Sequence, residues 1–335
     1  MAETILFDKV LGCLLAAEIG DAMGAPAENM TYQEIIAQFG EICDFTGSGT
    51  DDSALKHILC DAIEHTAGYP NADAWADAWM EHKAEFLKGM FWIPVMNSFW
   101  KISGESVVPR EAGSGNMASS SSAMCISPMG IINAGNPHQA ALETYELASL
   151  IHHNFARDGA CSMASAVAEA FRTDASVELI LQAAVEYLPP RSSQVMRGMI
   201  ADTLALARDA ATYPNFRERY YRERILPGIA MPDARETVPV ALSLFFLAKG
   251  DPRQTILYGA NFGHDADTIA SMAGALAGAL HGASALPTQW VEKSLANSRR
   301  DQMALAAMLV DVTLQRGEAL ARTTAQVKQL QSIST

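Results

Sequence analysis

Two short clusters of oxygen-bearing side chains are the part of this sequence best suited to chemistry. The first acidic cluster consists of Thr50, Asp51 and Asp52, and the second acidic cluster consists of Asp265, Asp267 and Thr268. Each cluster follows a glycine and opens a stretch with helical periodicity. Carboxylate and hydroxyl oxygens are the ligands that Mg²⁺, Mn²⁺ and Ca²⁺ prefer, whereas zinc prefers His and Cys. The two clusters therefore predict a site for one or two hard divalent cations.

Either cluster taken alone is also explained as a helix cap. Asp and Thr are favoured at helix N-termini, where they accept backbone N–H groups and face the positive end of the helix dipole. Capping needs one side chain, however, and each cluster offers three oxygen donors within four residues. The Ala- and Gly-rich helix predicted after Thr268 permits close packing, so we expect the second cluster to be deep and rigid. Carboxylates buried there without a partner would be costly, and this cost favours the metal site.

A glutamate after the first predicted helix is a candidate acid or base. The stretch "GCLLAAEIGDAMGAPAENM" begins as a small-residue helix, ends it at Gly20–Asp21 and places Glu28 on the Gly- and Pro-containing turn that follows. A single loop glutamate is usually only a solvated charge. A carboxyl group next to a metal site can also carry a proton to or from a reacting atom. Both interpretations of Glu28 remain open from the residues alone.

The elements that must position these residues are helices. Apolar residues recur at three- and four-residue spacing through most of the chain, and no series of alternating β-branched strands is present. The pattern predicts an all-α protein of roughly a dozen helices, with residues 1–335 forming a single domain. The exception is a Gly- and Ser-rich connection over residues 102–130, and a loop of this length is often functional. The alternative is a disordered linker between two domains.

Composition limits the partners and the cellular location. The chain of 335 residues has a net charge of −14, which argues against binding to nucleic acid or to an anionic membrane surface. Its five cysteines are odd in number and have no CxxC spacing, as is typical of reduced thiols in a cytoplasm. The N-terminus has no basic start of a signal peptide, and the longest apolar stretch is too short to span a bilayer. We expect a soluble, cytoplasmic protein.

Five motifs occur in the order that is known from one enzyme family. They read "GCLLAAEIGDAMGAPAE", "GSGTDDSALK", "GSGN…AMCISPMGIINAGNP", "ASLIHH" and "ANFGHDADTIASMAGALAGALHG". In these motifs the chain resembles the ADP-ribosylglycohydrolase family, which includes the dinitrogenase reductase-activating glycohydrolases. The resemblance covers residues 10 to about 290. The two acidic motifs at opposite ends of the chain make it specific.

This resemblance implies an orthogonal helical domain around a cleft that holds a binuclear Mg²⁺ or Mn²⁺ centre. The metal ligands that it implies are Thr50, Asp51, Asp52, Asp265, Asp267 and Thr268. Glu28 matches a glutamate on a flexible catalytic loop, and Asp52 and Asp267 are expected to be essential for catalysis together with it. The residues that it implies for substrate binding are Gly113, Ser114, Gly115, Asn116 and His152. For His152, a helix-end histidine with satisfied hydrogen bonds is the alternative.

The sequence departs from the family pattern along the expected substrate-binding wall. Where the family often reads "GNGAAMRIAPLG", this chain has additional residues at 117–122 and Cys125 in place of an arginine. His264 replaces the second glycine of the usual "GGDTDT", and "IHHNFARDG" replaces a "THGHP"-type segment. The ligand-type residues are all retained. The substrate therefore stays open even where the reaction class is implied.

The expected function is metal-dependent hydrolysis of the glycosidic bond of an ADP-ribosyl group, carried by a protein side chain or a small molecule. The metal ions would fix the ribose hydroxyls and orient water or the leaving group. One alternative keeps this chemistry but acts on another ribosylated metabolite or a nucleoside. Another is a non-catalytic family member that binds ADP-ribose or has a structural role.

Overall fold

Every regular element of the structure is a helix in the residues that it describes, which are 4–224 and 232–332. This computed structural model contains 17 α-helices and five short 3₁₀ turns in that part of the chain, and its one β-type contact is the isolated bridge between Met30 and His264. The all-α prediction is confirmed. The helices outnumber the expected dozen because elements as short as Lys83–Phe86 and Ser127–Ile132 cannot show a helical period.

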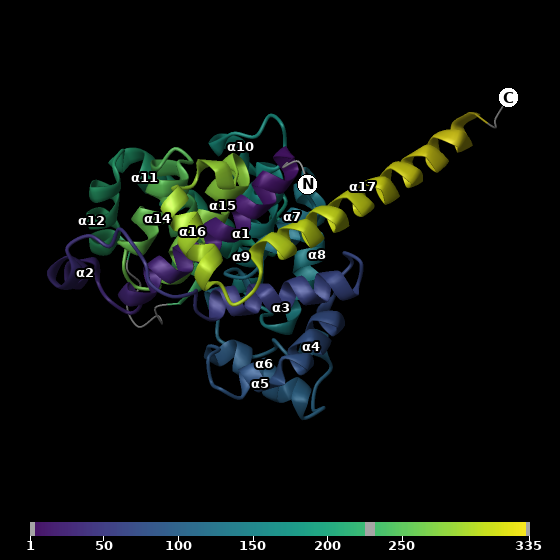
Figure 1. Cartoon of the computed structure of the whole chain (residues 1–335), viewed down its shortest axis with the longest axis horizontal. Helices are drawn as coiled ribbons and strands as arrows, with labels where there is room; N and C mark the ends of the chain where they lie inside the picture. The colour runs from purple at the N-terminus through teal and green to yellow at the C-terminus, as the bar shows by residue number, and fades with distance from the viewer. Residues whose placement is uncertain (1–3, 225–231, 333–335) are drawn as a thin grey trace.

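The elements follow one another in a simple order along the chain (Figure 1). The α-helices are α1 (Ile5–Gly24), α2 (Tyr32–Phe39), α3 (Asp51–His65), α4 (Ala72–Glu81), α5 (Lys83–Phe86), α6 (Ile93–Ser103), α7 (Ser127–Ile132), α8 (Pro137–Leu147), α9 (Phe155–Ala170), α10 (Val177–Glu186), α11 (Gln194–Ala210), α12 (Tyr213–Glu223), α13 (Ala234–Leu247), α14 (Pro252–Ala260), α15 (Ala266–His281), α16 (Thr288–Asn297) and α17 (Gln302–Ser332). The 3₁₀ turns are η1 (Ala25–Ala27), η2 (Pro109–Glu111), η3 (Ser120–Ser122), η4 (Ala148–Leu150) and η5 (Ala283–Ala285). Among the described helices, none is long and apolar enough to cross a membrane.

Two small-residue helices, α1 and α15, pack directly against each other in the core. A Cβ atom added at Gly20 of α1 would collide with the backbone of Ala270, and one added at Gly274 of α15 would collide with the backbone of Ala16. The same close approach continues to Gly24, whose missing side chain leaves room for the backbone of Asp267. The first turn of α15 is therefore held deep in the protein, as the Ala- and Gly-rich sequence predicted.

The Ser-rich connection between α6 and α7 is packed into the protein. Ser119, Ser120, Ser121 and Ser122 are each at most 2% exposed. Their hydroxyls contact side chains of distant segments, including Asp265 and His152. This part of the connection is therefore not an exposed linker. The assignment of residues 1–335 to a single domain stays a prediction.

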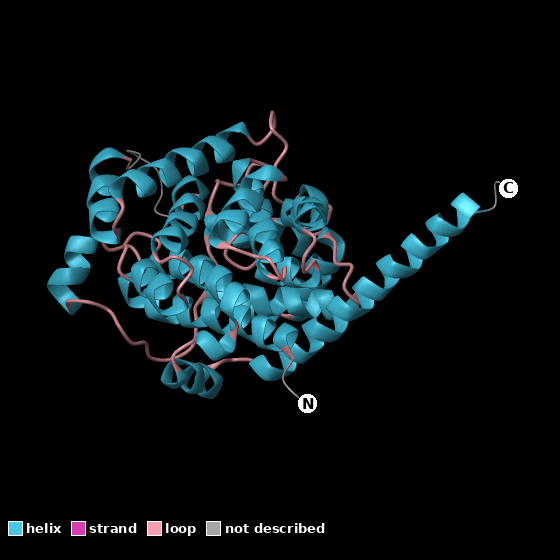
Figure 2. Cartoon of the chain, turned by 90° about the horizontal axis from the view of Figure 1, so that it is seen from above, coloured by secondary structure: helices cyan, strands magenta, loops and turns pink. Residues whose placement is uncertain are grey.

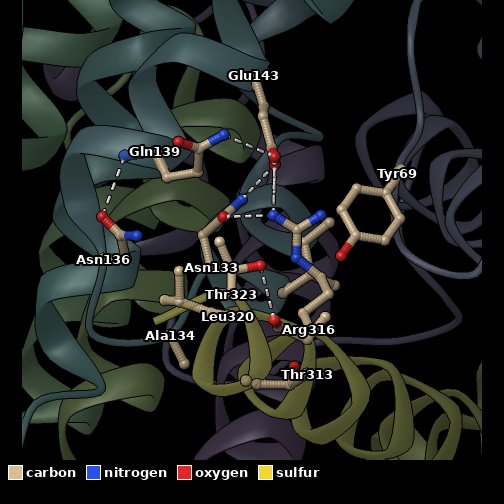
Figure 3. A pocket seen from close by; sticks show the side chains of 13 residues that line it. Tyr69, Asn133, Ala134, Asn136, Gln139, Glu143, Thr313, Arg316, Leu320 and Thr323 are labelled. Atoms are coloured by element: carbon tan, nitrogen blue, oxygen red, sulfur yellow. Dashed lines mark hydrogen bonds and ion pairs between the residues drawn. The ribbon is translucent and has the colours of Figure 1, made fainter. Parts of the chain in front are cut away.

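The last helix, α17, leaves the body of the protein and projects away from it in both views (Figures 1 and 2). Arg316 anchors it where it leaves. The Arg316 Nη2 atom donates to Glu143 Oε1 at 2.7 Å and to Asn133 Oδ1 at 2.8 Å, and its guanidinium lies 4.6 Å from the ring of Tyr69. These residues border a cavity of about 340 Å³ (Figure 3). The hydrogen-bonded arginine fixes the direction in which α17 leaves.

We expect Arg316→Ala to lower the free energy of unfolding by about 2–3 kcal/mol. The substitution leaves the Glu143 carboxylate, whose side chain is 19% exposed, without its cation, and lost hydrogen bonds to charged groups have this size. Arg322→Ala is the matched control, because Arg322 is exposed and faces Glu318 one turn away at 3.7 Å. It should cost less than about 0.5 kcal/mol. Urea unfolding followed by circular dichroism measures both, and equal costs would contradict the anchoring role.

Candidate functional site

The two acidic clusters meet at the N-termini of α3 and α15. Thr50 Oγ1 lies 3.4 Å from Asp267 Oδ2, and Thr268 Oγ1 donates to Asp52 Oδ1 at 3.3 Å. Each contact joins residues that are more than 200 positions apart in the sequence. The expected convergence of the clusters is confirmed. The role of these residues as metal ligands stays a prediction.

A further acidic side chain, Asp21, holds the first cluster in place from the last turn of α1. Its carboxylate is fully buried and accepts hydrogen bonds from the backbone N–H groups of Thr50 and Ser53, at 2.8 and 3.0 Å. It also accepts from the Ser53 hydroxyl at 2.6 Å. Asp21 thereby caps α3 from another helix. The sequence pattern indicates only a helix end at Asp21, although a carboxylate in so apolar a stretch is itself a sign of a buried polar contact.

A cavity of about 200 Å³ opens beside the clusters. Its lining residues are Glu28, Asn29, Asp51, Asp52, Gly89, Met90, Phe91, Trp92, Ser120, Ser121, Met124, Pro232, Asp265, Asp267 and Thr268. Five of them carry carboxylates, and within the described residues no Lys or Arg shares the lining. The lining is therefore suited to binding cations.

Burial and mutual repulsion raise the pKa values of the cluster carboxylates. Burial, followed by the charges of neighbouring aspartates, raises the pKa of Asp52 and of Asp267 well above the ordinary value. Burial and the Asp21 charge raise the pKa of Asp51 to about 6. The pKa of Asp265 rises to about 8, mainly through burial and the charges of Glu28 and Asp51. Asp265, with a pKa of about 8, therefore holds a proton at pH 7 unless a cation compensates its charge, whereas Asp51, with a pKa of about 6, is mostly ionised.

Two buried carboxylate oxygens of the acidic clusters lack a hydrogen-bond partner in the described part of the chain. They are Asp52 Oδ2 and Asp267 Oδ1, one from each cluster. Buried polar atoms are almost always paired in proteins, and a pair of carboxylate oxygens suits a hard cation. Within the described residues, no three His, Cys, Asp or Glu side chains lie close enough together to bind a metal ion. Repulsion between uncompensated carboxylates favours such a wider spacing.

The raised pKa values predict how stability depends on pH without divalent cations. The pKa of Asp265 is about 8 in the folded protein against an ordinary 3.8. Between about pH 4 and pH 8 the folded protein thus holds a proton that the unfolded chain has lost, so rising pH favours unfolding. We expect the thermal midpoint in EDTA to fall across this range, and Mn²⁺ to raise it most at the alkaline end. An increase of the thermal midpoint by Mn²⁺ that is largest at low pH would contradict this predicted pH dependence.

Backbone hydrogen bonds hold the turn that carries Glu28 beside the second cluster. Asn29 N–H donates to His264 O at 2.7 Å, and His264 N–H donates to Met30 O at 2.6 Å. His264 has a φ of 57°, which explains why glycine is usual in the related motif, and histidine is one of the residues that tolerates this conformation. Its Nδ1 lies 2.6 Å from Glu236 Oε1. Glu28 itself is exposed and borders the cavity.

Part of the Ser-rich segment forms the cavity wall next to the second cluster. The Ser120 hydroxyl donates to Asp265 Oδ2 at 2.9 Å, and its backbone N–H donates to Pro232 O at 2.7 Å. Ser122 Oγ lies 2.8 Å from His152 Nδ1 behind this wall. Burial lowers the pKa of His152 to about 3, so the ring is neutral. In this structure His152 supports the serine segment and does not line the cavity.

The predicted substrate loop at residues 113–116 also lies outside the cavity lining. The Asn116 side-chain amide donates to Pro94 O, Ser98 Oγ and Ile151 O at 2.9–3.0 Å. Gly113 N–H donates to Ser149 O. These residues connect α6 to the segment before α9, and their role in substrate binding stays a prediction.

A different alignment with the family pattern predicts that the serines, and not residues 113–116, belong to the site. Matching "AMCISPMG" to the family pattern without an insertion places residues 119–121 where the family often reads "GNG". Cys125, at the family's arginine position, is buried and its thiol contacts Ser121 O at 3.6 Å. The wall over residues 89–92 was also missed, because "GMFW" has no ligand-type side chain. Trp92 N–H nevertheless donates to Asp51 Oδ2 at 3.2 Å.

The chain is similar to known proteins in sequence and in fold. The sequence is similar to the Uncharacterized protein YegU of Escherichia coli (strain K12), at 27% identity over 307 residues that cover 83% of this chain and 89% of YegU. It is also similar to the ADP-ribosyl-[dinitrogen reductase] glycohydrolase of Rhodospirillum rubrum, at 26% identity over 310 residues that cover 88% of this chain and 92% of that protein. A solved structure of an "ADP-ribosylglycohydrolase-related protein complex" has the same fold, with a TM-score of 0.68 at 21% identity.

That structural match covers 92% of this chain and 98% of the solved one. The model of the family described as ADP-ribosylglycohydrolase matches residues 2–319, which leaves only the outer part of α17 beyond it. The match includes both acidic clusters, Asp21, Glu28 and the serine wall. The protein therefore belongs to the ADP-ribosylglycohydrolase family.

Proposed function

We propose that this protein is a metal-dependent hydrolase that cleaves the glycosidic bond between an ADP-ribosyl group and a protein side chain. One observation carries the proposal, namely five carboxylates around one small cavity, with an unpartnered buried oxygen from each acidic cluster. Family membership supports the reaction class. The name of the Rhodospirillum rubrum relative, an ADP-ribosyl-[dinitrogen reductase] glycohydrolase, supports a protein as the carrier of the ADP-ribosyl group.

Six residues would hold two Mg²⁺ or Mn²⁺ ions in this proposal. They are Thr50, Asp51, Asp52, Asp265, Asp267 and Thr268. When bound, such ions supply fixed positive charge that positions ribose hydroxyls or water next to the anomeric carbon. Asp21 holds the first cluster through the backbone of Thr50 and Ser53, and Ser120 holds Asp265 by its hydroxyl. Asp21 and Ser120 therefore fix the positions of the proposed ligands.

The remaining chemistry requires proton transfers. Hydrolysis places a water oxygen on the anomeric carbon, breaks the bond to the leaving nitrogen or oxygen, and moves one proton from water to the leaving group. Positive charge develops on the ribose ring as the bond breaks, and the carboxylates around the cavity stabilise it. Glu28 borders the cavity and is the residue that we assign to one of the two proton transfers.

A smaller substrate is the second candidate. The cavity is only about 200 Å³, and Cys125 and the serines replace residues that are usual in the family. Both observations suit another ribosylated metabolite or a nucleoside. A non-catalytic role in binding ADP-ribose is disfavoured, because all six ligand-type residues and Glu28 are retained.

We place the enzyme in the cytoplasm, since all five cysteines are free thiols and four of them are buried.

Product release from defined substrates tests the proposal. Purified protein with Mg²⁺ or Mn²⁺ is incubated with ADP-ribosyl-arginine, with an arginine-ADP-ribosylated protein and with plain nucleosides, and the products are separated by chromatography. We expect ADP-ribose from the first two and none after chelation by EDTA. Turnover of nucleosides alone would replace the proposal by the second candidate. No turnover of any substrate, with ADP-ribose still bound, would favour the non-catalytic alternative.

A further inference from the structure

The outer part of α17 is exposed on all sides. Residues 321–331 are all exposed, and the helix projects away from the body of the protein in both views (Figures 1 and 2). Isolated helices of this length are marginal in water, because most helical stability in proteins comes from packing. The composition does not compensate for this, since Gly317, Thr323, Thr324 and Val327 are weak helix formers. Such a helix gains stability when one of its faces is packed.

One face of this outer part carries no charge. Four of its residues recur at spacings of three and four positions and therefore share one side of the helix, namely Leu320, Thr323, Val327 and Leu330. We call these four residues the neutral face. Its three apolar side chains are 56–69% exposed. The charged residues Glu318, Arg322 and Lys328 fall outside this series. This alternating spacing of three and four is typical of the seam between two paired helices.

Gly317 leaves an unfilled space beside the neutral face. It lies inside α17, where glycine costs about 1 kcal/mol relative to alanine. Gly20 and Gly274 make room for a neighbouring backbone, but a Cβ atom added at Gly317 meets no atom of the described structure within 4 Å. Gly317 and Leu320 also border the cavity of about 340 Å³ at the base of the projecting helix (Figure 3). A second helix can therefore approach α17 closely at this point.

Charge makes a second copy of this chain a suitable occupant of the neutral face. Residues 320–332 contain Arg322 and Lys328 but no acidic residue, whereas the whole chain has a net charge of −14. Two copies attract each other where the cationic helix of one faces the acidic body of the other. An antiparallel pairing of the helices produces this contact, because it directs each helix tip toward the other body. A parallel pairing would place two acidic bodies side by side.

The neutral face is self-complementary in the antiparallel direction. When Thr323 of one copy lies opposite Thr323 of the other, Leu320 faces Val327 of the partner subunit. In the same register, Leu330 of the partner subunit lies opposite Gly317, at the border of the cavity. The exposed apolar side chains of both copies are then buried, and the unfilled space beside Gly317 is occupied.

We propose that the outer part of α17 binds the same segment of a second copy of this chain, as an antiparallel helix pair centred on Thr323. The inference does not depend on the proposed function, because no residue of α17 belongs to the described lining of the carboxylate cavity. The helix tip also lies beyond the range that matches the family model. Twenty residues of helix span only about 30 Å. We therefore expect a dissociation constant of about 10–100 μM, as for small interfaces.

Sedimentation equilibrium of the full-length protein tests the pairing. Between about 1 and 500 μM the wild type should shift from the mass of one chain to twice that mass. The Val327→Gln, Leu330→Gln double variant should associate at least about 100-fold more weakly, because each dimer loses four buried apolar side chains. Neither substitution changes the net charge. At about 1 μM, where both proteins are monomeric, the variant should have the thermal midpoint of the wild type.

The matched control is an Ala321→Gln, Ala325→Gln double variant, which places the same side chains on exposed positions outside the neutral face. It should associate like the wild type. The inference is overturned if the wild type stays monomeric throughout this range, which would leave the neutral face to a different protein. It is also overturned if both double variants associate equally well. Hydrolysis of ADP-ribosyl-arginine is measured separately, so neither result bears on the proposed function.

Cysteine cross-linking tests the direction of the pairing. The exposed Cys43 is replaced by serine in both single variants, so that it cannot form the cross-link. Thr323→Cys should give a disulfide-linked dimer under mild oxidation. Leu330→Cys should not, because an antiparallel pair places the two positions about 21 Å apart, and a disulfide needs Cα atoms within about 7 Å. A disulfide-linked dimer of the Leu330→Cys variant would indicate a parallel pair and overturn the inference.

Discussion

Asp267→Asn is expected to lower kcat/KM by at least about 10³-fold while leaving the helical circular dichroism spectrum unchanged. A factor of this size corresponds to about 4 kcal/mol of lost transition-state stabilisation. Asp267 is 3% exposed, its Oδ1 has no hydrogen-bond partner in the described structure, and its backbone is wedged against Gly24. The substitution keeps the shape of the side chain and removes the charge that a divalent cation needs.

The same substitution should not destabilise the metal-free protein. Burial and the charges of Asp265 and Asp21 raise the pKa of Asp267 well above its ordinary value, so a neutral amide relieves repulsion there. We expect a thermal midpoint in EDTA that is equal to or above that of the wild type, and a loss of Mn²⁺ affinity. Asp77→Asn, on the exposed face of α4, is the matched control and should change none of these. Wild-type turnover at limiting metal would contradict the assignment of Asp267 as a ligand.

Glu28→Gln is expected to reduce turnover by about 10²–10⁴-fold, the usual contribution of a positioned acid or base. The variant keeps the size of the side chain and removes its titratable proton. Glu28 borders the cavity but lies on the turn after η1, on neither of the two helices whose N-termini carry the clusters. Its backbone neighbours Asn29 and Met30 are tied to His264, so the turn should keep its place in the variant.

Measuring the Mn²⁺ affinity of the variant distinguishes an acid–base role of Glu28 from a role as a metal ligand. Glu28→Gln should bind Mn²⁺ about as tightly as the wild type, and the limb of the pH–rate profile that reports the glutamate should disappear. Glu41→Gln, a substitution of an exposed glutamate in the chain segment after α2, is the control and should behave like the wild type. Normal turnover across the working pH range would refute the acid–base role. Loss of the metal would instead make Glu28 a ligand.

The sequence was sufficient to predict the helices and the meeting of the two acidic clusters. Helical periods and the Ala- and Gly-rich stretch after Thr268 are local patterns, and they indicated both the all-α fold and a deeply packed α15. The pairing of the two clusters followed from chemistry, because three oxygen donors within four residues exceed what a helix cap needs. These predictions depended on neighbours in the sequence or on ligand preference alone.

The contacts that support the clusters could not be predicted in the same way. Asp21 caps α3 from α1, and Ser120 holds Asp265 across 145 positions of sequence, so both depend on how the helices cross. A serine or an aspartate in an apolar segment does not indicate which distant residue it will contact. The wall formed by Met90 and Trp92 contributes a backbone N–H and apolar surface, which carry no sequence pattern. Tertiary packing, not local propensity, places these groups.

A titration of the metal-free protein with Mn²⁺ tests the central claim, that the two acidic clusters form one centre for divalent cations. Isothermal titration calorimetry near pH 7.5 gives the affinity and the number of ions per chain directly. We predict two Mn²⁺ ions per chain, bound with release of protons because the pKa of Asp265 is raised to about 8, and loss of this binding in Asp267→Asn. No binding of Mn²⁺ by the wild type at concentrations up to about 1 mM, or binding that Asp267→Asn leaves intact, would contradict the account.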